Sequence, residues 1–161
     1  MLYNIKKSFA THHIKQDDHI IYFEEYGNPK GIPVIFLHGG PGSGCNEGQK
    51  AIFDYRKYRV VFLDQRGSGK SSPKGEMKNN TTSKLIDDIE VVRKYLKIEK
   101  WIVVGGSWGA TLALAYGQAH TDRVEAMILR ALFLGTKKEI EWAFFYAPLK
   151  FRPELIYRLN D

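Results

Sequence analysis

Short apolar runs alternate along this chain with stretches of helical spacing and with glycine-rich turns. The runs at residues 33–37 and 59–63 are almost wholly apolar, which predicts parallel strands that are covered on both faces of a sheet. Between residues 82 and 97, apolar side chains recur every three or four positions, which predicts an amphipathic helix. Strands that alternate with helices predict the α/β fold class and a mainly parallel, doubly wound sheet.

The same pattern predicts further strands on either side of these elements. Residues 3–9 and 19–26 are expected as early strands, and the second ends at the turn of residues 27–31. Residues 101–104 and 124–129 are expected as later strands of the same sheet. Between them, residues 111–115 are almost wholly apolar and predict a buried helix.

Length, composition and charge limit the classes of protein to consider. A chain of 161 residues with 43% hydrophobic content suits one globular domain with a sizeable core. The net charge of +6 is spread along the chain without a basic stripe interleaved with aromatic residues, so no nucleic-acid partner is expected. No signal peptide or membrane span is evident, which predicts a cytoplasmic protein without a membrane partner. The single cysteine, Cys45, excludes an internal disulfide and is interpreted as a small buried thiol.

The most specific motif follows the strand at residues 101–104. Gly105-x-Ser107-x-Gly109 fits the nucleophile elbow of α/β-hydrolases, a sharp turn from strand to helix that lifts one serine hydroxyl above the sheet. A Cβ at either flanking glycine would collide with the neighbouring strand or helix. Ser107 is therefore the candidate catalytic nucleophile.

A glycine-rich loop at residues 38–45 follows an earlier strand, at the edge of the sheet where open α/β folds bind their ligands. Acyl transfer needs backbone donors aimed at the developing oxyanion, and glycines let the main chain come close. The candidate oxyanion hole is the N–H of Gly40 together with that of Trp108; the alternative is a plain tight loop. His38 is interpreted as a structural residue whose ring hydrogen-bonds this loop.

A second glycine-rich loop, residues 64–72, contains Gly-Ser-Gly-Lys-Ser and so suggests a phosphate-binding loop. The Walker pattern requires a glycine five residues before Gly69, where this chain has Asp64, and that carboxylate would repel phosphate. A nucleotide site is therefore disfavoured, and Asp64 is expected to pair with Arg66 and brace the loop. No cluster of residues has metal-ligand spacing, so neither a metal nor another cofactor is expected.

Taken together, these motifs resemble those of proline iminopeptidases, serine peptidases of the α/β-hydrolase fold that release N-terminal proline from peptides. The residues that carry the resemblance are His38-Gly39-Gly40-Pro41-Gly42, Asp64-Gln65-Arg66-Gly67-Ser68-Gly69-Lys70-Ser71, Asn79-Asn80-Thr81-Thr82 and Gly105-Gly106-Ser107-Trp108-Gly109. The resemblance implies a peptide substrate with an N-terminal proline, Ser107 as nucleophile, Gly40 and Trp108 as the oxyanion hole, and Phe133 as a residue of the substrate pocket. It also implies a hydrolase core over residues 1–134 and the start of a helical cap over residues 135–161.

The remaining members of a catalytic triad are not evident. In this fold the acid and the histidine follow the serine along the chain, and the only later histidine, His120, would lie roughly 20 Å away at the far end of a helix. His12, His13 and His19 are interpreted as exposed residues of early strands. We therefore expect an N-terminal fragment that ends within the cap and before the last strands, that is nearly inactive alone, and whose strand at residues 124–129 is an open edge prone to self-association.

Three alternatives remain open at this point. The first is another α/β-hydrolase activity: an esterase or amidase would differ only in substrate profile, whereas an epoxide hydrolase would need an aspartate where Ser107 stands. The second is the disfavoured phosphate-binding module. The third is a non-catalytic fragment that associates with a complementary chain.

Overall fold

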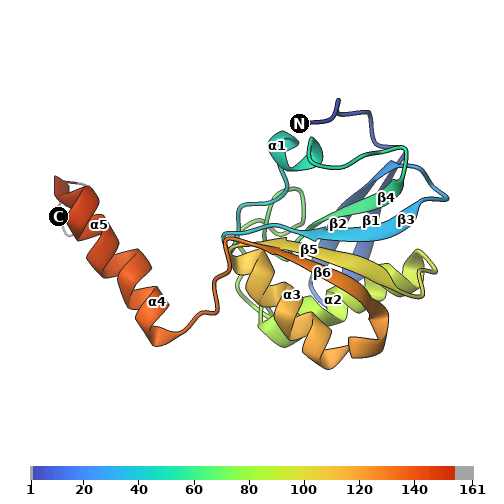
Figure 1. Ribbon diagram of the computed structural model, residues 1–161. Helices are drawn as coiled ribbons and strands as arrows, with labels where there is room; N and C mark the ends of the chain where they lie inside the picture. The colour runs from blue at the N-terminus through green and yellow to red at the C-terminus, as the bar shows by residue number, and fades with distance from the viewer. Residues whose placement is uncertain (1, 155–161) are drawn as a thin grey trace.

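The computed structural model describes residues 2–154 and contains a six-stranded sheet in the order β1-β2-β4-β3-β5-β6 (Figure 1). β1 and β2, and β2 and β4, pair antiparallel, whereas the other three pairings are parallel. The predicted α/β class and mainly parallel sheet are therefore confirmed. The strands are β1 (Ala10–Gln16), β2 (His19–Gly27), β3 (Ile32–Leu37), β4 (Tyr58–Asp64), β5 (Trp101–Gly106) and β6 (Val124–Arg130).

Helices lie on both faces of this sheet. α2 (Thr82–Tyr95) and α3 (Trp108–Ala119) cover one face, and the short α1 (Glu47–Lys50) lies on the other (Figure 1). The side chain of Thr81 accepts the N–H of Lys84 and caps the start of α2. A 3₁₀ turn, Thr121–Arg123, joins α3 to β6.

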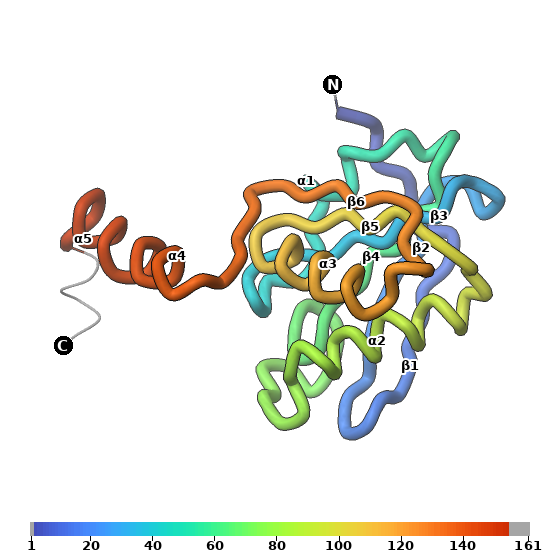
Figure 2. The backbone as a smooth tube through the Cα atoms, turned by 60° about the horizontal axis from the view of Figure 1, so that its bottom comes forward, coloured from blue at the N-terminus to red at the C-terminus, as the bar shows by residue number. Residues whose placement is uncertain are grey.

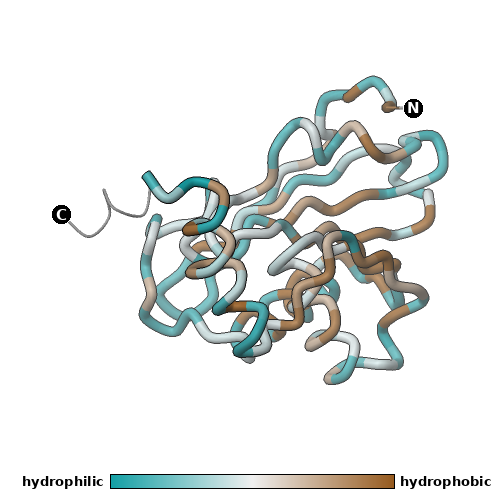
Figure 3. The backbone as a smooth tube through the Cα atoms, turned by 60° about the vertical axis from the view of Figure 1, so that its left-hand side comes forward, coloured by the Kyte–Doolittle hydropathy of each residue, from teal (hydrophilic) through white to brown (hydrophobic). Residues whose placement is uncertain are grey.

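Two apolar clusters, one on each face, form the core, and Figure 3 shows the apolar residues running along the strands and the inner helices. The larger cluster packs α2 and α3 against the sheet through Ile89, Leu112 and Tyr116, all fully buried. The smaller cluster lies under α1 and the following loop and includes Phe53 and Phe62. Burial of these side chains from water is the main force that holds the layers together.

The structure corrects two expectations about the N-terminal region. Residues 3–9 form no strand: β1 begins at Ala10, opposite Glu25 of β2. Before it, the N–H of Tyr3 donates to the carbonyl oxygen of Ala51 at 2.8 Å, so the segment leaves β2 for the chain after α1. His19 is not exposed; it is fully buried, and its Nε2 lies 2.8 Å from the carbonyl oxygen of Lys78. His12 is half-buried and stacks on Phe23, whereas His13 is exposed as expected.

The outer edge of β6 and the face beside it are open among the described residues. β6 is the last strand of the sheet, and its Ile128 is 57% exposed because no described helix covers that side. Beyond β6, α4 (Lys137–Glu141), a π-helical turn (Trp142–Tyr146) and α5 (Ala147–Phe151) form a helical segment that extends away from the sheet (Figure 2). Within residues 2–154, no helix is both long and apolar enough to cross a bilayer.

Candidate functional site

Ser107 occupies a strained turn between β5 and α3. Its backbone has φ 55° and ψ −124°, a combination that side-chain-bearing residues rarely adopt. Serine often caps a helix with its hydroxyl, but here the side chain makes no capping hydrogen bond to α3, and the residue is exposed. The turn therefore presents the hydroxyl outside the core, at the edge of the sheet where parallel strands end.

The glycines on either side of Ser107 are required by close backbone contacts. A Cβ on Gly105 would lie 2.2 Å from the carbonyl oxygen of Gly109, and a Cβ on Gly109 would lie 2.1 Å from that of Leu37. The predicted steric reason for the two glycines is confirmed. The turn is thus wedged between its own helix and the neighbouring strand β3.

The first glycine-rich loop lies directly against this elbow. A Cβ on Gly39 would lie 2.9 Å from the carbonyl oxygen of Gly106 and 3.3 Å from the Cβ of Ser107. Gly40 follows with φ +121°, which a side chain would strain. Gly40 and Ser107 line one cavity of about 490 Å³ together with Ser43, Gln49, Val104, Ile128 and Arg130, among others.

Trp108 and Phe133 lie outside the lining of that cavity. As the first residue of α3, Trp108 carries an amide without an intrahelical acceptor, which is what an oxyanion donor requires. Trp108 instead lines a second cavity of about 270 Å³, together with Pro41 and Gln65 among others. Phe133 lies between β6 and α4, where its carbonyl oxygen accepts the hydroxyl of Thr111. The catalytic and binding roles of Ser107, Gly40, Trp108 and Phe133 stay predictions.

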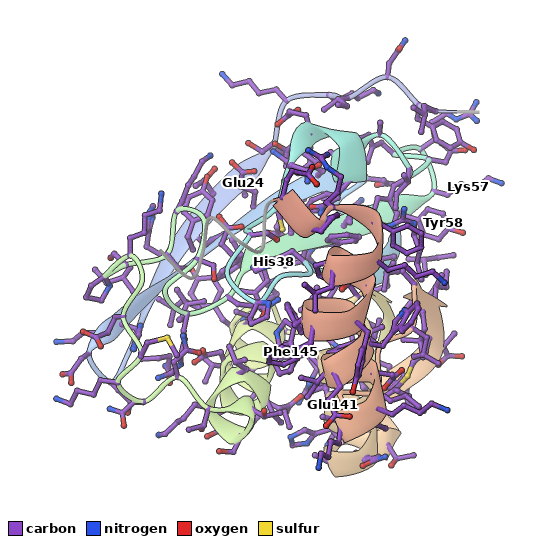
Figure 4. The ribbon with its side chains drawn as sticks, turned by 90° about the vertical axis from the view of Figure 1, so that its left-hand side faces the viewer. Glu24, His38, Lys57, Tyr58, Glu141 and Phe145 are labelled. Atoms are coloured by element: carbon purple, nitrogen blue, oxygen red, sulfur yellow. The ribbon has the colours of Figure 1, made fainter. Side chains whose placement is uncertain are left out.

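His38 is held inside the protein at the end of β3 (Figure 4). Its Nε2 accepts the backbone N–H of Gln65 at 3.0 Å, so the proton must be on Nδ1, which lies 2.8 Å from the carbonyl oxygen of Gly39. Burial lowers the pKa of His38, which keeps the ring neutral. Both nitrogens are engaged, which confirms the predicted structural role and leaves none to act as a base for Ser107.

Asp64 and Arg66 do not pair with each other as expected. The chain turns after β4, so Asp64 faces the two glycine-rich loops and accepts the N–H of Cys45 at 2.7 Å and of Lys70 at 2.8 Å. Arg66 turns towards α2 and binds Asp88 with distances of 2.6 and 2.7 Å. The carboxylate of Asp64 thus takes up amides that a phosphate-binding loop would offer to its ligand.

Cys45 is half-buried, and its thiol points towards the carbonyl oxygen of Leu63. Burial and the nearby carboxylate of Asp64 raise the pKa of the Cys45 thiol. The thiolate that nucleophilic attack requires is therefore disfavoured.

Gln65 connects the first glycine-rich loop to the start of α3. This role could not be predicted from the sequence, because the pattern does not show which groups a polar residue after a strand will contact. Its Nε2 donates to the carbonyl oxygen of His38 at 2.8 Å, and its Oε1 accepts the indole N–H of Trp108 at 2.9 Å. The available signals are its position at the end of a buried strand and its place in the motif of residues 64–71, and neither shows its hydrogen-bond partners.

The other four histidines are distant from Ser107. His120 follows the last residue of the twelve-residue α3, roughly 18 Å along the helix axis. β1, with His12 and His13, is four strands from β5, and neighbouring strands are about 4.8 Å apart, which gives roughly 19 Å. By the same arithmetic, His19 in β2 is roughly 14 Å away. All five histidines of the chain are thereby accounted for.

Comparison with known proteins agrees with this geometry. Residues 32–150 match the family model described as the alpha/beta hydrolase fold. The chain is 49% identical over 144 residues to a proline iminopeptidase of Arabidopsis thaliana, covering 89% of this chain and 38% of the relative. It is 48% identical over 142 residues to a proline iminopeptidase of Neisseria gonorrhoeae, covering 88% of this chain and 46% of the relative.

A solved structure is also similar. The crystal structure of a proline iminopeptidase-related protein from Thermus thermophilus superposes with a TM-score of 0.67 at 28% identity, over 74% of this chain and 43% of the other. The resemblance expected from the motifs is confirmed. The chain spans less than half of the length of the curated relatives it matches.

Proposed function

The chain belongs to the α/β-hydrolase fold family, and on that premise we propose that it serves in a serine aminopeptidase that releases N-terminal proline from peptides, with Ser107 as the nucleophile. The observation that carries the proposal is the strained, exposed Ser107 against the Gly39–Gly40 loop in one cavity. The similarity to proline iminopeptidases over nearly nine-tenths of the chain supports the substrate class.

The mechanism is acyl transfer. The Oγ of Ser107 attacks the carbonyl carbon of the N-terminal proline while a histidine removes the hydroxyl proton. The negative charge on the carbonyl oxygen is stabilised by the amides of Gly40 and Trp108. The peptide amine takes the proton and leaves, and water then hydrolyses the prolyl ester of Ser107 to free proline.

The general base comes from polypeptide other than these 161 residues. His38 has both ring nitrogens engaged, and the remaining four histidines lie roughly 14 Å or more from Ser107. A serine without its base loses several orders of magnitude in rate. The chain alone therefore hydrolyses prolyl substrates at least about 10³-fold more slowly than the same chain supplied with the acid and the base.

The test is to extend the chain with the second half of the Neisseria gonorrhoeae relative and to assay hydrolysis of a proline arylamide. Turnover that is abolished by Ser107→Ala supports the proposal. Because a hybrid can fail to fold, circular dichroism and the relative's own full chain serve as controls. A folded hybrid without turnover, or with turnover that Ser107→Ala leaves unchanged, contradicts it.

A second candidate function, favoured by the open edge of β6 and the exposed Ile128, is association with another chain. An unpaired strand offers a row of N–H and C=O groups to a partner strand. A complementary chain that adds strands there also places its own residues near the cavity of Ser107, so the two functions are compatible. The test is a pull-down in which this chain is the bait for the second half of the Neisseria gonorrhoeae relative. Absence of binding when that half is in 10-fold molar excess contradicts this second function.

A further inference from the structure

We propose that Gln65 is a positioning residue of the oxyanion site, which holds the first glycine-rich loop in register with the start of α3. This inference rests on the proposed function, because it concerns the two amides, of Gly40 and Trp108, that stabilise the oxyanion there. It also gives a role to the second glycine-rich loop, which the catalytic mechanism otherwise leaves unused.

The hydrogen bonds of the Gln65 side chain can be assigned without ambiguity. The carbonyl oxygen of His38 only accepts, so the amide nitrogen must face it, at 2.8 Å. The indole nitrogen of Trp108 only donates, so the amide oxygen must face it, at 2.9 Å. Glutamine suits this position because its side chain offers a donor and an acceptor at once, whereas a carboxylate offers only acceptors.

The Gln65 side chain joins the chain after β3 to the chain after β5, at a point where sheet pairing no longer fixes their relative position. β3 and β5 pair only as far as Leu37 and Gly105, and both candidate oxyanion donors come after those residues. Beyond that point, the Gln65 side chain joins the residue before Gly39 to the residue after Ser107. The side chain is buried, with Gln65 only 4% exposed, so water does not replace these bonds when they are lost.

Hydrogen bonds on either side of the Gln65 side chain hold the first glycine-rich loop in place. The N–H of Gln65 donates to the ring of His38, and the adjacent Asp64 holds the N–H of Cys45 at the other end of the same loop. The loop is therefore fastened at both ends by two consecutive residues of the second loop. Movement of the His38 carbonyl, next to the Gly39–Gly40 turn, relative to the indole of Trp108 requires the Gln65 bonds to break or to stretch.

The test compares Gln65→Leu and Gln65→Glu in the extended chain described above, with Gln118→Leu and Gln118→Glu as matched controls at an exposed position of α3. A displacement of the oxyanion donors by about 1 Å lowers the rate of the chemical step roughly 10- to 100-fold. We expect Gln65→Leu to lower kcat by that factor with KM within about twofold of the unchanged sequence, since the lost interaction acts on the transition state.

Gln65→Glu adds a second measurement, the pH dependence of kcat, which a purely structural role of Gln65 would leave unchanged. The introduced carboxylate accepts from Trp108 but donates to His38 only when it is protonated. The ratio of its kcat to that of the unchanged sequence should therefore rise as the pH falls from 8 to 5, while the same ratio for Gln118→Glu stays flat. This isosteric variant also serves if Gln65→Leu fails to fold.

The outcomes separate the two proposals. Turnover that depends on Ser107 but is unchanged in both Gln65 variants, a loss confined to KM, or a flat pH ratio for Gln65→Glu overturns the role of Gln65 and leaves the proposed function intact. Absence of Ser107-dependent turnover in the unchanged sequence removes the proposed function, and the inference with it.

Discussion

Gly109, in the first turn of α3, lies so close to β3 that a Cβ at this position would be 2.1 Å from the carbonyl oxygen of Leu37. Helix and strand meet here through their backbones, without side chains between them. This contact sets the position of α3, and hence of Ser107 at its start, relative to the loop that follows β3.

Substitution at this contact should destabilise the fold. We expect Gly109→Ala to lower the free energy of unfolding by at least about 2 kcal/mol, because the neighbouring atom belongs to a backbone that cannot rotate away. Gly106→Ala is the matched control, since its Cβ would meet only the carbonyl oxygen of Arg130 at 3.9 Å. Urea denaturation measures both; equal losses in the two variants would show that the contact does not determine stability.

The neutral state of His38 predicts a stability change near neutral pH. Its pKa is lowered in the folded protein, chiefly by burial, so between that value and the ordinary 6.5 the unfolded chain binds more protons. His38 is therefore neutral in both states above pH 6.5, and stability falls as the pH drops below 6.5, by up to about 1.4 kcal/mol per pH unit.

Thermal unfolding between pH 7 and pH 5 checks this expectation. The melting temperature should depend less on pH in His38→Gln than in the unchanged chain, whereas His13→Gln, at an exposed position, should keep the original slope. An unchanged slope in His38→Gln would contradict it.

A second pH effect should appear in acid, through Glu90. The guanidinium of Arg93 and the hydroxyl of Tyr116 hydrogen-bond its carboxylate and lower the pKa of Glu90 from 4.5 to about 2. Because the pKa is lowered in the fold, this stabilisation is present above pH 4.5 and is lost as the pH falls towards 2.

Glu90→Gln should therefore cost about 2 kcal/mol at pH 7 and progressively less below pH 4.5. Glu99→Gln, at an exposed position beyond the C-terminal end of α2, is the control and should change stability little at either pH. Urea unfolding at pH 7 and pH 3 measures the difference. If Glu90→Gln lowers the free energy of unfolding equally at pH 7 and pH 3, the ion pair of Glu90 with Arg93 does not stabilise the fold.

The open edge of β6 predicts concentration-dependent self-association of the chain. Ile128→Lys places a charge on the exposed side of β6 and should shift the distribution towards monomer. Light scattering coupled to size exclusion, over a tenfold range of concentration, measures this. Leu149→Lys in α5 tests whether the helical segment is responsible instead: a larger effect there would move the interface away from β6.

Elements with a strong local pattern could be predicted closely from the sequence. The expected strands at residues 101–104 and 124–129 correspond to β5 (Trp101–Gly106) and β6 (Val124–Arg130). The errors arose where the outcome depends on a distant partner. The segment before Ala10 has strand-like composition, but the N–H of Tyr3 donates to the carbonyl oxygen of Ala51 instead of continuing the pairing with β2. Arg66 likewise binds Asp88 on α2 instead of Asp64 two positions away.

The candidate site also has some residues that the local sequence predicts and others that only the fold brings together. Ser107 and the flanking glycines follow from local sterics, so the motif alone indicates them. The bridge from Gln65 to Trp108 joins residues that are 43 positions apart, and only the folded sheet brings them together. Burial of His19 likewise depends on the approach of the segment around Lys78.

The backbone of Ser107 has a consequence for how this sequence evolves. With φ 55° and ψ −124°, the position suits glycine better than serine, and replacement by glycine would relieve about 1 kcal/mol or more of strain. A drift towards greater stability would therefore remove the hydroxyl. Folding alone gives no reason for serine here, which is what the proposed role of Ser107 as a nucleophile predicts.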